Sequence, residues 1–356
     1  MTSRERIMAI LTGQPADRIS WAPLLDGYFT TSLPEQNMPE MDELGVTKYT
    51  GADLILRHVH TYNTHHDDTI TITDSTEGDT DIKTISTPVG SVSIHHLRRG
   101  RTSFKTKPFV EDIEDIRVMK YIAEHASYSL NLEAFRKVSD RIGDYGIATV
   151  SMPLTPIQQL LQHDADIETF TYLLYDYEDE MREYMNVVHK RNLEQYRLLA
   201  STPDDIKVMI AYEDTSTTVM SPAWFEEFCL DELNEYARIL HEGNKIFITH
   251  MCGKLTGMLP MLKRLEVDGF DSVCPPTTGD LEACDALREL PGKVIIGGIE
   301  PPMLQRMTAE QTREYAARVL DACVGSGRFI LSTGDATPYG TPIENLSVVA
   351  ELVNKL

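Results

Sequence analysis

The run KIFITHMC, residues 245–252, is apolar until it ends in a histidine and a cysteine one residue apart. It is one of eight β-rich runs in the chain, and a loop and then a stretch with helical periodicity separate it from the next. The longest stretch with helical periodicity covers residues 155–200. The other seven runs are ISWAPLL (19–25), ADLILRHV (52–59), IATVSM (147–152), KVMIAYED (207–214), GFDSVCPP (269–276), KVIIGGIE (293–300) and RFILSTGD (328–335).

Eight strands that alternate with helices predict a parallel sheet, and eight such units predict a closed (β/α)8 TIM barrel in the α/β class. A doubly wound open sheet is the alternative, but no glycine-rich dinucleotide loop follows the first strand. Residues 69–97 break the pattern, because alternating β-branched residues and turn signals there predict antiparallel hairpins inserted after the second strand. We therefore expect a single domain over residues 1–356, with a hairpin insertion over 69–107.

The composition excludes several classes of function. The formal net charge is −22 and the pI is near 4.8, which argues against a nucleic-acid-binding surface. No apolar run approaches the roughly 20 residues that a membrane span needs. The chain shows no secretory signal and its five cysteines are scattered, so we expect a cytoplasmic protein with free thiols or metal ligands.

Metal-binding residue types gather where successive strands end. In a TIM barrel the carboxyl ends of the strands build the catalytic face, and consecutive strands are neighbours. The sequence thus predicts that Glu213, His250, Cys252 and Cys274 converge at the barrel mouth. Zinc accepts thiolate, imidazole and carboxylate ligands, whereas magnesium and manganese prefer oxygen. These four residues are the predicted catalytic and metal-binding set.

Each of these residues also has an ordinary structural interpretation. A cysteine at a strand end is often a small buried residue, a histidine there can bind a neighbouring backbone group, and Glu213 could pair with an arginine. Cys229, Cys284 and Cys323 lie on predicted helices, where burial is the expected role. The coincidence of four ligand-type side chains at three successive strand ends favours the metal site.

Other polar and aromatic residues fall on the same predicted face. His58 and His60 follow the second strand, and Tyr28 and Tyr339 lie in loops at the same end. Substrate contact is the expected role of these four residues, with ordinary loop packing as the alternative.

The order of motifs resembles the uroporphyrinogen decarboxylase superfamily, and within it the corrinoid-dependent zinc methyltransferases. SRERIMAILTGQPADRISWAP (3–23) resembles the opening helix and first strand, and residues 220–253 resemble the helix and strand that carry His-x-Cys-Gly. GDATPYGTPIENL (334–346) matches the closing loop and the start of the last helix. The resemblance therefore extends over nearly the whole chain and implies a TIM barrel.

Two departures from the family pattern bear on function. The first-strand loop LLDGYFTTSLPEQ (24–36) lacks the arginines with which decarboxylases grip porphyrin carboxylates. In the thiol-methylating members a cysteine after the last strand is the third zinc ligand, and Asp335 stands there in this sequence. The resemblance therefore implies that Cys274 with Glu213, or Asp335 as the reserve, completes the shell around zinc.

The resemblance implies methyl transfer between a small methyl donor or acceptor and the cobalt of a corrinoid. The zinc would hold a substrate thiol as a thiolate or polarise an ether oxygen. This chain has no corrinoid-binding Asp-x-His-x-x-Gly segment, so the corrinoid would come on a separate carrier protein. The sequence leaves the oligomeric state open.

Three other functions stay open from the sequence. In a metal-free tetrapyrrole decarboxylase, Asp26 or Asp214 would bind the pyrrole nitrogens. A non-catalytic barrel could bind a corrinoid or tetrapyrrole, and an unrelated zinc hydrolase would need Glu300 as its general base.

Overall fold

The computed structural model of the protein describes residues 1–355. The chain divides into two compact units. The first unit contains Met1–Thr61, Leu132–Met152 and the chain from Thr202 onward, and the second contains Tyr62–Asn131 and Pro153–Ser201. The prediction of one domain over residues 1–356 stays a prediction.

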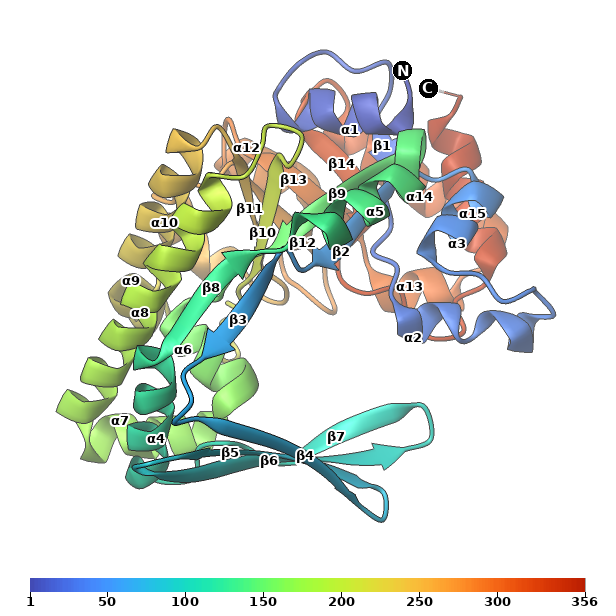
Figure 1. The fold of residues 1–356 in the computed structure, drawn as a ribbon. Coiled ribbons are helices and arrows are strands. Elements are labelled where there is room, and N and C mark those ends of the chain that lie inside the picture. Colours follow the sequence, from blue (N-terminus) through green and yellow to red (C-terminus); the bar gives the residue numbers. More distant parts are fainter. Residues whose placement is uncertain (356) are drawn as a thin grey trace. The chain divides into compact units, whose positions relative to one another are not determined.

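The first unit is built on an eight-stranded parallel sheet, which confirms the predicted α/β class and TIM-barrel fold (Figure 1). Every one of the eight predicted β-rich runs contributes a strand, and the order in the sheet is β1-β14-β13-β12-β11-β10-β9-β2. The strands are β1 (Ser20–Trp21), β2 (Leu54–Val59), β9 (Gly146–Ser151), β10 (Val208–Tyr212), β11 (Ile246–His250), β12 (Gly269–Val273), β13 (Val294–Ile299) and β14 (Phe329–Thr333).

Branched aliphatic side chains fill the interior of this sheet. Val208 and Ile210 of β10 pack with Ile246 and Ile248 of β11 and with the equivalent residues of the other strands. Because side chains alternate along a strand, the next inward positions on β10 and β11 are Tyr212 and His250. The apolar interior therefore gives way to polar and aromatic groups at the carboxyl ends.

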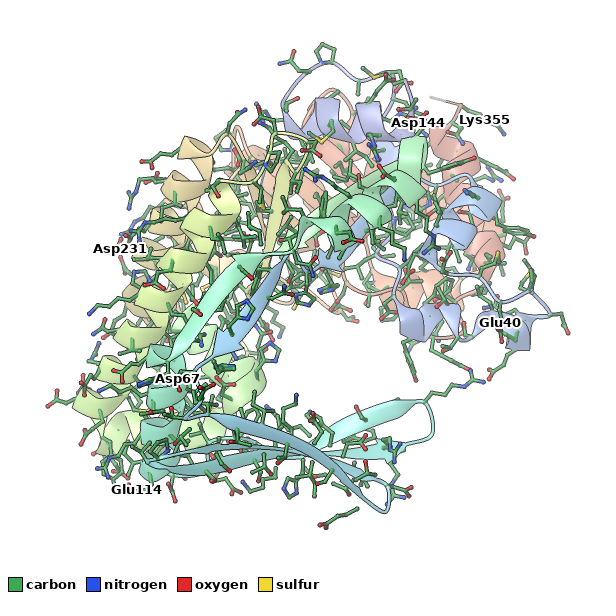
Figure 2. All side chains as sticks on the ribbon, viewed as in Figure 1. Glu40, Asp67, Glu114, Asp144, Asp231 and Lys355 are labelled. Carbon is green, nitrogen blue, oxygen red and sulfur yellow. The ribbon has the colours of Figure 1, made fainter. Side chains whose placement is uncertain are left out.

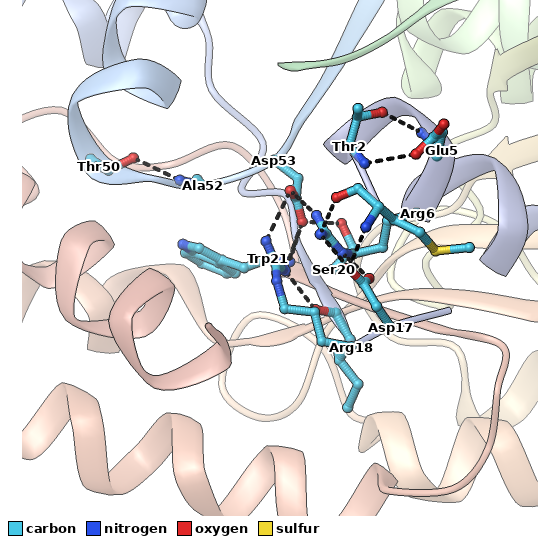
Figure 3. A network of polar contacts seen from close by, with 12 residues as sticks. Thr2, Glu5, Arg6, Asp17, Arg18, Ser20, Trp21, Thr50, Ala52 and Asp53 are labelled. Carbon is cyan, nitrogen blue, oxygen red and sulfur yellow. Dashed lines mark hydrogen bonds and ion pairs between the residues drawn. The ribbon is translucent and has the colours of Figure 1, made fainter. Parts of the chain in front are cut away.

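The two outer strands of the order, β1 and β2, are joined by Asp53 (Figure 3). Its amide donates to the carbonyl of Trp21 at 2.7 Å, and its buried carboxylate accepts hydrogen bonds from Ser20 Oγ and the Trp21 amide. The same carboxylate pairs with Arg6 at 2.9 Å and Arg18 at 3.1 Å. This Asp53 network links the amino-terminal segment to the start of β2.

Helices follow the strands of the first unit, as the sequence predicts. Near the amino terminus α1 follows its Thr2 cap, and it contributes Ile7, Ile10 and Leu11 to the barrel interior. The helices are α1 (Ser3–Leu11), α2 (Gly27–Thr30), α3 (Glu43–Thr50), α5 (Leu132–Ile142), α9 (Pro222–Phe228), α10 (Leu230–Glu242), α11 (Leu259–Leu262), α12 (Ala283–Glu289), α13 (Pro301–Arg306), α14 (Ala309–Cys323) and α15 (Ile343–Val353).

The second unit contains the inserted hairpins that the sequence predicts after the second strand. Strands β4 (Thr71–Glu77), β5 (Thr80–Thr87), β6 (Gly90–Arg99) and β7 (Thr102–Lys107) form one antiparallel sheet in chain order (Figure 1). Helix α4 (Ile113–Glu124) packs Val118 and Ile122 against this sheet.

Further elements of the second unit are a separate strand pair and the helices that the sequence predicts as one stretch over 155–200. The pair β3 (Tyr62–His66) and β8 (Ala126–Leu130) is antiparallel. The helices are α6 (Pro156–Gln159), a π-helical turn (Leu160–Asp164), α7 (Ile167–Asp176) and α8 (Glu178–Ala200).

The acidic side chains that give the chain its net charge of −22 are widely distributed (Figure 2). Glu40, Asp144 and Asp231 are exposed in the first unit, and Asp67 and Glu114 in the second. Within residues 1–355, no helix combines the length and the apolar character that crossing a bilayer would require.

Candidate functional site

Two neighbouring strands end together in aromatic rings at the barrel mouth, which we define as the carboxyl ends of the eight parallel strands. Tyr212 of β10 and His250 of β11 are partners in the parallel register. Their ring centroids lie 4.8 Å apart, and His58 stacks on Tyr212 at 4.2 Å with 16° between the ring planes. The three rings form a row that begins at buried His250 and ends at exposed His58.

His58 is held at the mouth by an irregularity in β2. The register of β2 on β9 shifts between Leu56 and Val59, and His58 has a φ of 66°. A non-glycine residue in this left-handed region is uncommon and is often associated with functional sites. Partial burial of the ring, together with the nearby positive charge of Arg57, lowers the pKa of His58.

A buried carboxylate fixes the orientation of His250. Asp271 Oδ2 lies 2.8 Å from His250 Nδ1. Arg57 binds the same carboxylate with two nitrogens, Nη2 to Oδ1 at 2.8 Å and Nε to Oδ2 at 3.1 Å. Burial alone would raise the pKa of Asp271, but Arg57 and His250 hold it well below its usual range.

Cys252 lies at the same end of β11, two residues beyond His250. Its side chain is partly buried, and its Sγ lies 3.7 Å from Asp214 Oδ1. Burial and the negative charges of Asp214 and Asp335 raise the pKa of the thiol to about 12.

Cys274 is buried where the loops after β12 and β14 meet. Ser272 Oγ donates to the carbonyl of Gly334 at 2.8 Å, and a Cβ at Gly334 would lie only 2.5 Å from Cys274 Sγ. Burial and the charges of Glu300 and Asp335 raise the pKa of Cys274 to about 12. Asp335 therefore acts electrostatically on both thiols.

Glu213, the fourth predicted ligand, lies directly after β10, and its place in a metal shell stays a prediction. It follows Tyr212 directly, so alternation places it on the other face of β10. It lies near Glu232 of α10, whose pKa is raised well above the usual value by burial and by the charge of Glu213. The Glu213 amide nevertheless donates to the carbonyl of His250 at 2.9 Å, so the two residues adjoin through their backbones while their side chains have different neighbours.

The predicted substrate contacts have the following positions. Tyr28 and Tyr339 pack together with ring centroids 5.0 Å apart, and His60 is exposed after β2. Asp26 caps α2 by accepting from the Phe29 amide at 2.7 Å. Asp335 Oδ1 accepts from the next backbone amide, that of Ala336, at 2.7 Å.

The donor types at the mouth are those that zinc takes, namely one imidazole, two thiols and nearby carboxylates. Over residues 1–355, however, no three His, Cys, Asp or Glu side chains lie close enough together to hold a metal ion as they stand. A metal at this place would require the side chains of Cys252, Cys274 and Asp335 to draw together around His250.

The sequence reasoning missed Arg57, Tyr212 and Asp271, the residues that hold His250 in place. A signal was present, because Arg57 and Asp271 are charged residues within apolar β-rich runs. Buried charges are almost always paired, so each of them required a partner on another strand.

Comparison with known proteins places the chain in a family. A family model described as uroporphyrinogen decarboxylase (URO-D) matches residues 2–356. A solved methyltransferase from Methanosarcina mazei has a TM-score of 0.65 at 14% identity, covering 100% of this chain and 99% of that chain. A Rhodococcus sp. endo-glycoceramidase II in complex with a cellobiose-like imidazole has a TM-score of 0.35 at 10% identity, covering 62% and 66%.

No curated protein matches the sequence significantly. The similarity to the Methanosarcina mazei methyltransferase extends over both whole chains and shows a shared fold. Because the family model spans residues 2–356, the chain belongs to the uroporphyrinogen decarboxylase (URO-D) family.

Proposed function

We propose that this protein is a zinc-dependent methyltransferase that moves a methyl group between a small substrate and the cobalt of a separate corrinoid protein. The observation that carries the proposal is the pair His250 and Cys252 at the end of β11, with His250 Nδ1 already bound to a carboxylate at 2.8 Å. Histidines that bind zinc usually donate their other ring nitrogen to a carboxylate or a carbonyl. The substrate would be a methoxylated or methylated compound, or a thiol.

His250 and Cys252 would supply the first two ligands. Asp335 suits the third position, because its charge acts on both Cys252 and Cys274. Cys274 would be the fourth ligand. Glu213 is less suited, since it lies near Glu232 on the far side of β10.

When bound, zinc would supply Lewis acidity that lowers the pKa of a substrate thiol or polarises the oxygen of a methyl ether. The chain itself supplies the negative charges that would attract the cation. Burial, together with the charges of Asp214 and Asp335, raises the pKa of Cys252 to about 12, so this thiol keeps its proton in the metal-free protein. We therefore expect metal uptake to release a proton from Cys252 and to weaken as the pH falls.

The fold shared with a methyltransferase supports this reaction class, and the first-strand loop argues against decarboxylation. The first-strand loop over residues 24–36 contains no arginine, and Asp26 in that loop already caps α2. An octa-anionic porphyrin would meet no positively charged side chain from this loop.

Elemental analysis of the purified protein tests the proposal. We expect about one zinc ion per chain after reconstitution with Zn²⁺, and loss of this zinc in Cys252→Ser. Cys284→Ser is the matched control, because Cys284 is a partly buried thiol on α12. The control should keep its zinc.

Methyl transfer is measured in the same preparations by absorbance, with free methylcobalamin and a thiol in one direction and cob(I)alamin and a methoxylated benzoate in the other. We expect turnover in one of the two assays and at least a tenfold loss in Cys252→Ser, about 1.4 kcal/mol. A wild-type protein that binds no zinc, together with a fully active Cys252→Ser variant, would contradict the proposal.

A further inference from the structure

We infer that Asp271, itself locked by Arg57, is a positioning residue that fixes the His250 ring with its hydrogen on Nδ1 and so directs Nε2 to the barrel mouth as a metal ligand. This inference rests on the proposed function for the identity of the ligand. It goes beyond that proposal by assigning roles to two residues that touch neither the metal nor the substrate.

The tautomer follows from the hydrogen-bond geometry. Arg57 donates to both oxygens of Asp271, at 2.8 and 3.1 Å, and a carboxylate held in this two-pronged way is ionised. An ionised carboxylate can only accept hydrogen bonds. His250 Nδ1, at 2.8 Å from Oδ2, must therefore be the donor. In a neutral imidazole the lone pair then lies on Nε2.

The surroundings leave the ring little freedom. His250, Asp271 and Arg57 are all buried, at 8%, 0% and 7% exposure. The Tyr212 ring packs against His250 at 4.8 Å and limits its rotation. A small cavity of about 10 Å³ in the barrel interior is lined by both Arg57 and Asp271, so the ion pair lies inside the barrel with the aliphatic core.

The ion pair of Arg57 and Asp271 crosses the barrel, and its geometry distinguishes a role in stability from the inferred role in positioning His250. Arg57 comes from β2 and Asp271 from β12, and these strands are not neighbours in the sheet order. A buried ion pair adds little net stability compared with apolar residues of the same volume. What the pair does provide is an acceptor for His250 Nδ1, and this hydrogen bond fixes the orientation of the ring.

The first test measures the tautomer in the metal-free wild-type protein. Nitrogen-15 NMR of histidine-labelled protein, with the His250 signals assigned through His250→Gln, reports which ring nitrogen carries the hydrogen. We expect the hydrogen on Nδ1. A neutral ring with its hydrogen on Nε2 would overturn the inference, and the position of the hydrogen is read in the wild-type protein itself.

The second test measures metal affinity in Asp271→Asn and Arg57→Lys. Zinc affinity is obtained by competition with a chromophoric chelator, and the cobalt(II) absorption spectrum reports ligand geometry. We expect zinc affinity to fall about 10- to 100-fold in Asp271→Asn, the usual effect of losing such a carboxylate, with an altered cobalt spectrum. Thr149→Val, a change at another residue that lines the interior cavity, is the control and should bind zinc as the wild type does.

The outcomes separate the inference from the proposed function. If the wild-type protein binds no zinc, the proposed function fails, while the NMR result still decides the tautomer. If the wild-type protein binds zinc and Asp271→Asn binds it equally well with an unchanged cobalt spectrum, the inference fails and the proposed function stands.

Discussion

Gly334 lies so close to Cys274 that no side chain fits between them. A Cβ at position 334 would be 2.5 Å from Cys274 Sγ and 2.8 Å from its Cα. We expect Gly334→Ala to lower the free energy of unfolding by about 1–3 kcal/mol, the usual cost of overpacking, and to weaken zinc binding by displacing Cys274. Urea denaturation and zinc competition measure the two effects.

Gly27→Ala is the matched control for this change, because nothing lies within 4 Å of a Cβ built at Gly27. Its stability and zinc affinity should equal those of the wild type. If Gly334→Ala also kept the stability and zinc affinity of the wild type, Cys274 and Gly334 could move apart without cost.

Asp164 in the second unit should make stability depend on pH. Burial raises the pKa of this carboxyl to about 6, even though Gln159 Nε2 donates to it at 3.0 Å. Because the folded pKa lies above the ordinary value of 3.8, the proton stabilises the folded state. That stabilisation is complete below pH 3.8 and is lost as the pH rises through about 6.

Asp164→Asn should therefore flatten the pH dependence and raise the stability at pH 7.5, by up to about 3 kcal/mol. The measurement is the free energy of unfolding from urea titrations at pH 5.5 and 7.5. Asp144→Asn, a change at an exposed carboxyl of the first unit, should leave the slope unchanged. An equal slope in wild type and Asp164→Asn would contradict the assignment.

The sequence could predict the positions of some site residues but not of others. His250 and Cys252 were located by their position after an apolar run, which depends only on neighbours in the chain. The face of Glu213 could have been predicted from the same alternation, because Ile210 and Tyr212 occupy the inward positions. The bond between Arg57 and Asp271 spans 214 residues, and only the folded barrel brings them together.

The junction of β1 and β2 depends on the Asp53 network. Asp53→Ala would leave Arg6 and Arg18 without this carboxylate, and removing one partner of a buried ion pair costs about 3–5 kcal/mol. We expect a loss of that size in the free energy of unfolding, measured by urea denaturation.

Asp17→Ala is the informative comparison, because Asp17 also pairs with Arg6 but its side chain is 39% exposed. Exposed pairs contribute about 0–1 kcal/mol, so this variant should be much less affected. Equal losses in the two variants would show that the burial of Asp53 does not set its contribution.

Elements with strong periodicity were predicted and weakly patterned ones were not. The pair β3 and β8 was missed because β3 exposes polar residues on both faces and its paired residues lie 60 to 68 positions away. Helix α4 was missed although Asp112 and Asp115 form a capping box at its start. The long helical stretch over 155–200 contains breaks at residues 160–166 and at Tyr177 that its periodicity did not reveal.

For the whole chain, the fold was predictable and the chemistry less so. Eight repeats of one strand–helix unit determine the barrel class, because each unit connects its strand to the next by the same parallel crossover. The proposed metal ligation depends instead on side chains at or just after the ends of three different strands, β11, β12 and β14, and no local pattern shows how these side chains meet. The proposed carrier protein and substrate are separate molecules, so this sequence cannot identify them.

The pairing of β1 with β14 has a consequence for synthesis on the ribosome. Ser20 meets Ile330 in the register, so the first strand has no sheet partner on that side until nearly the whole chain has been made. The Asp53 network joins residues at most 47 positions apart and can form early. It therefore anchors the amino-terminal segment of the nascent chain before β14 has been made. At that stage the unpaired edge of β1 is prone to aggregation.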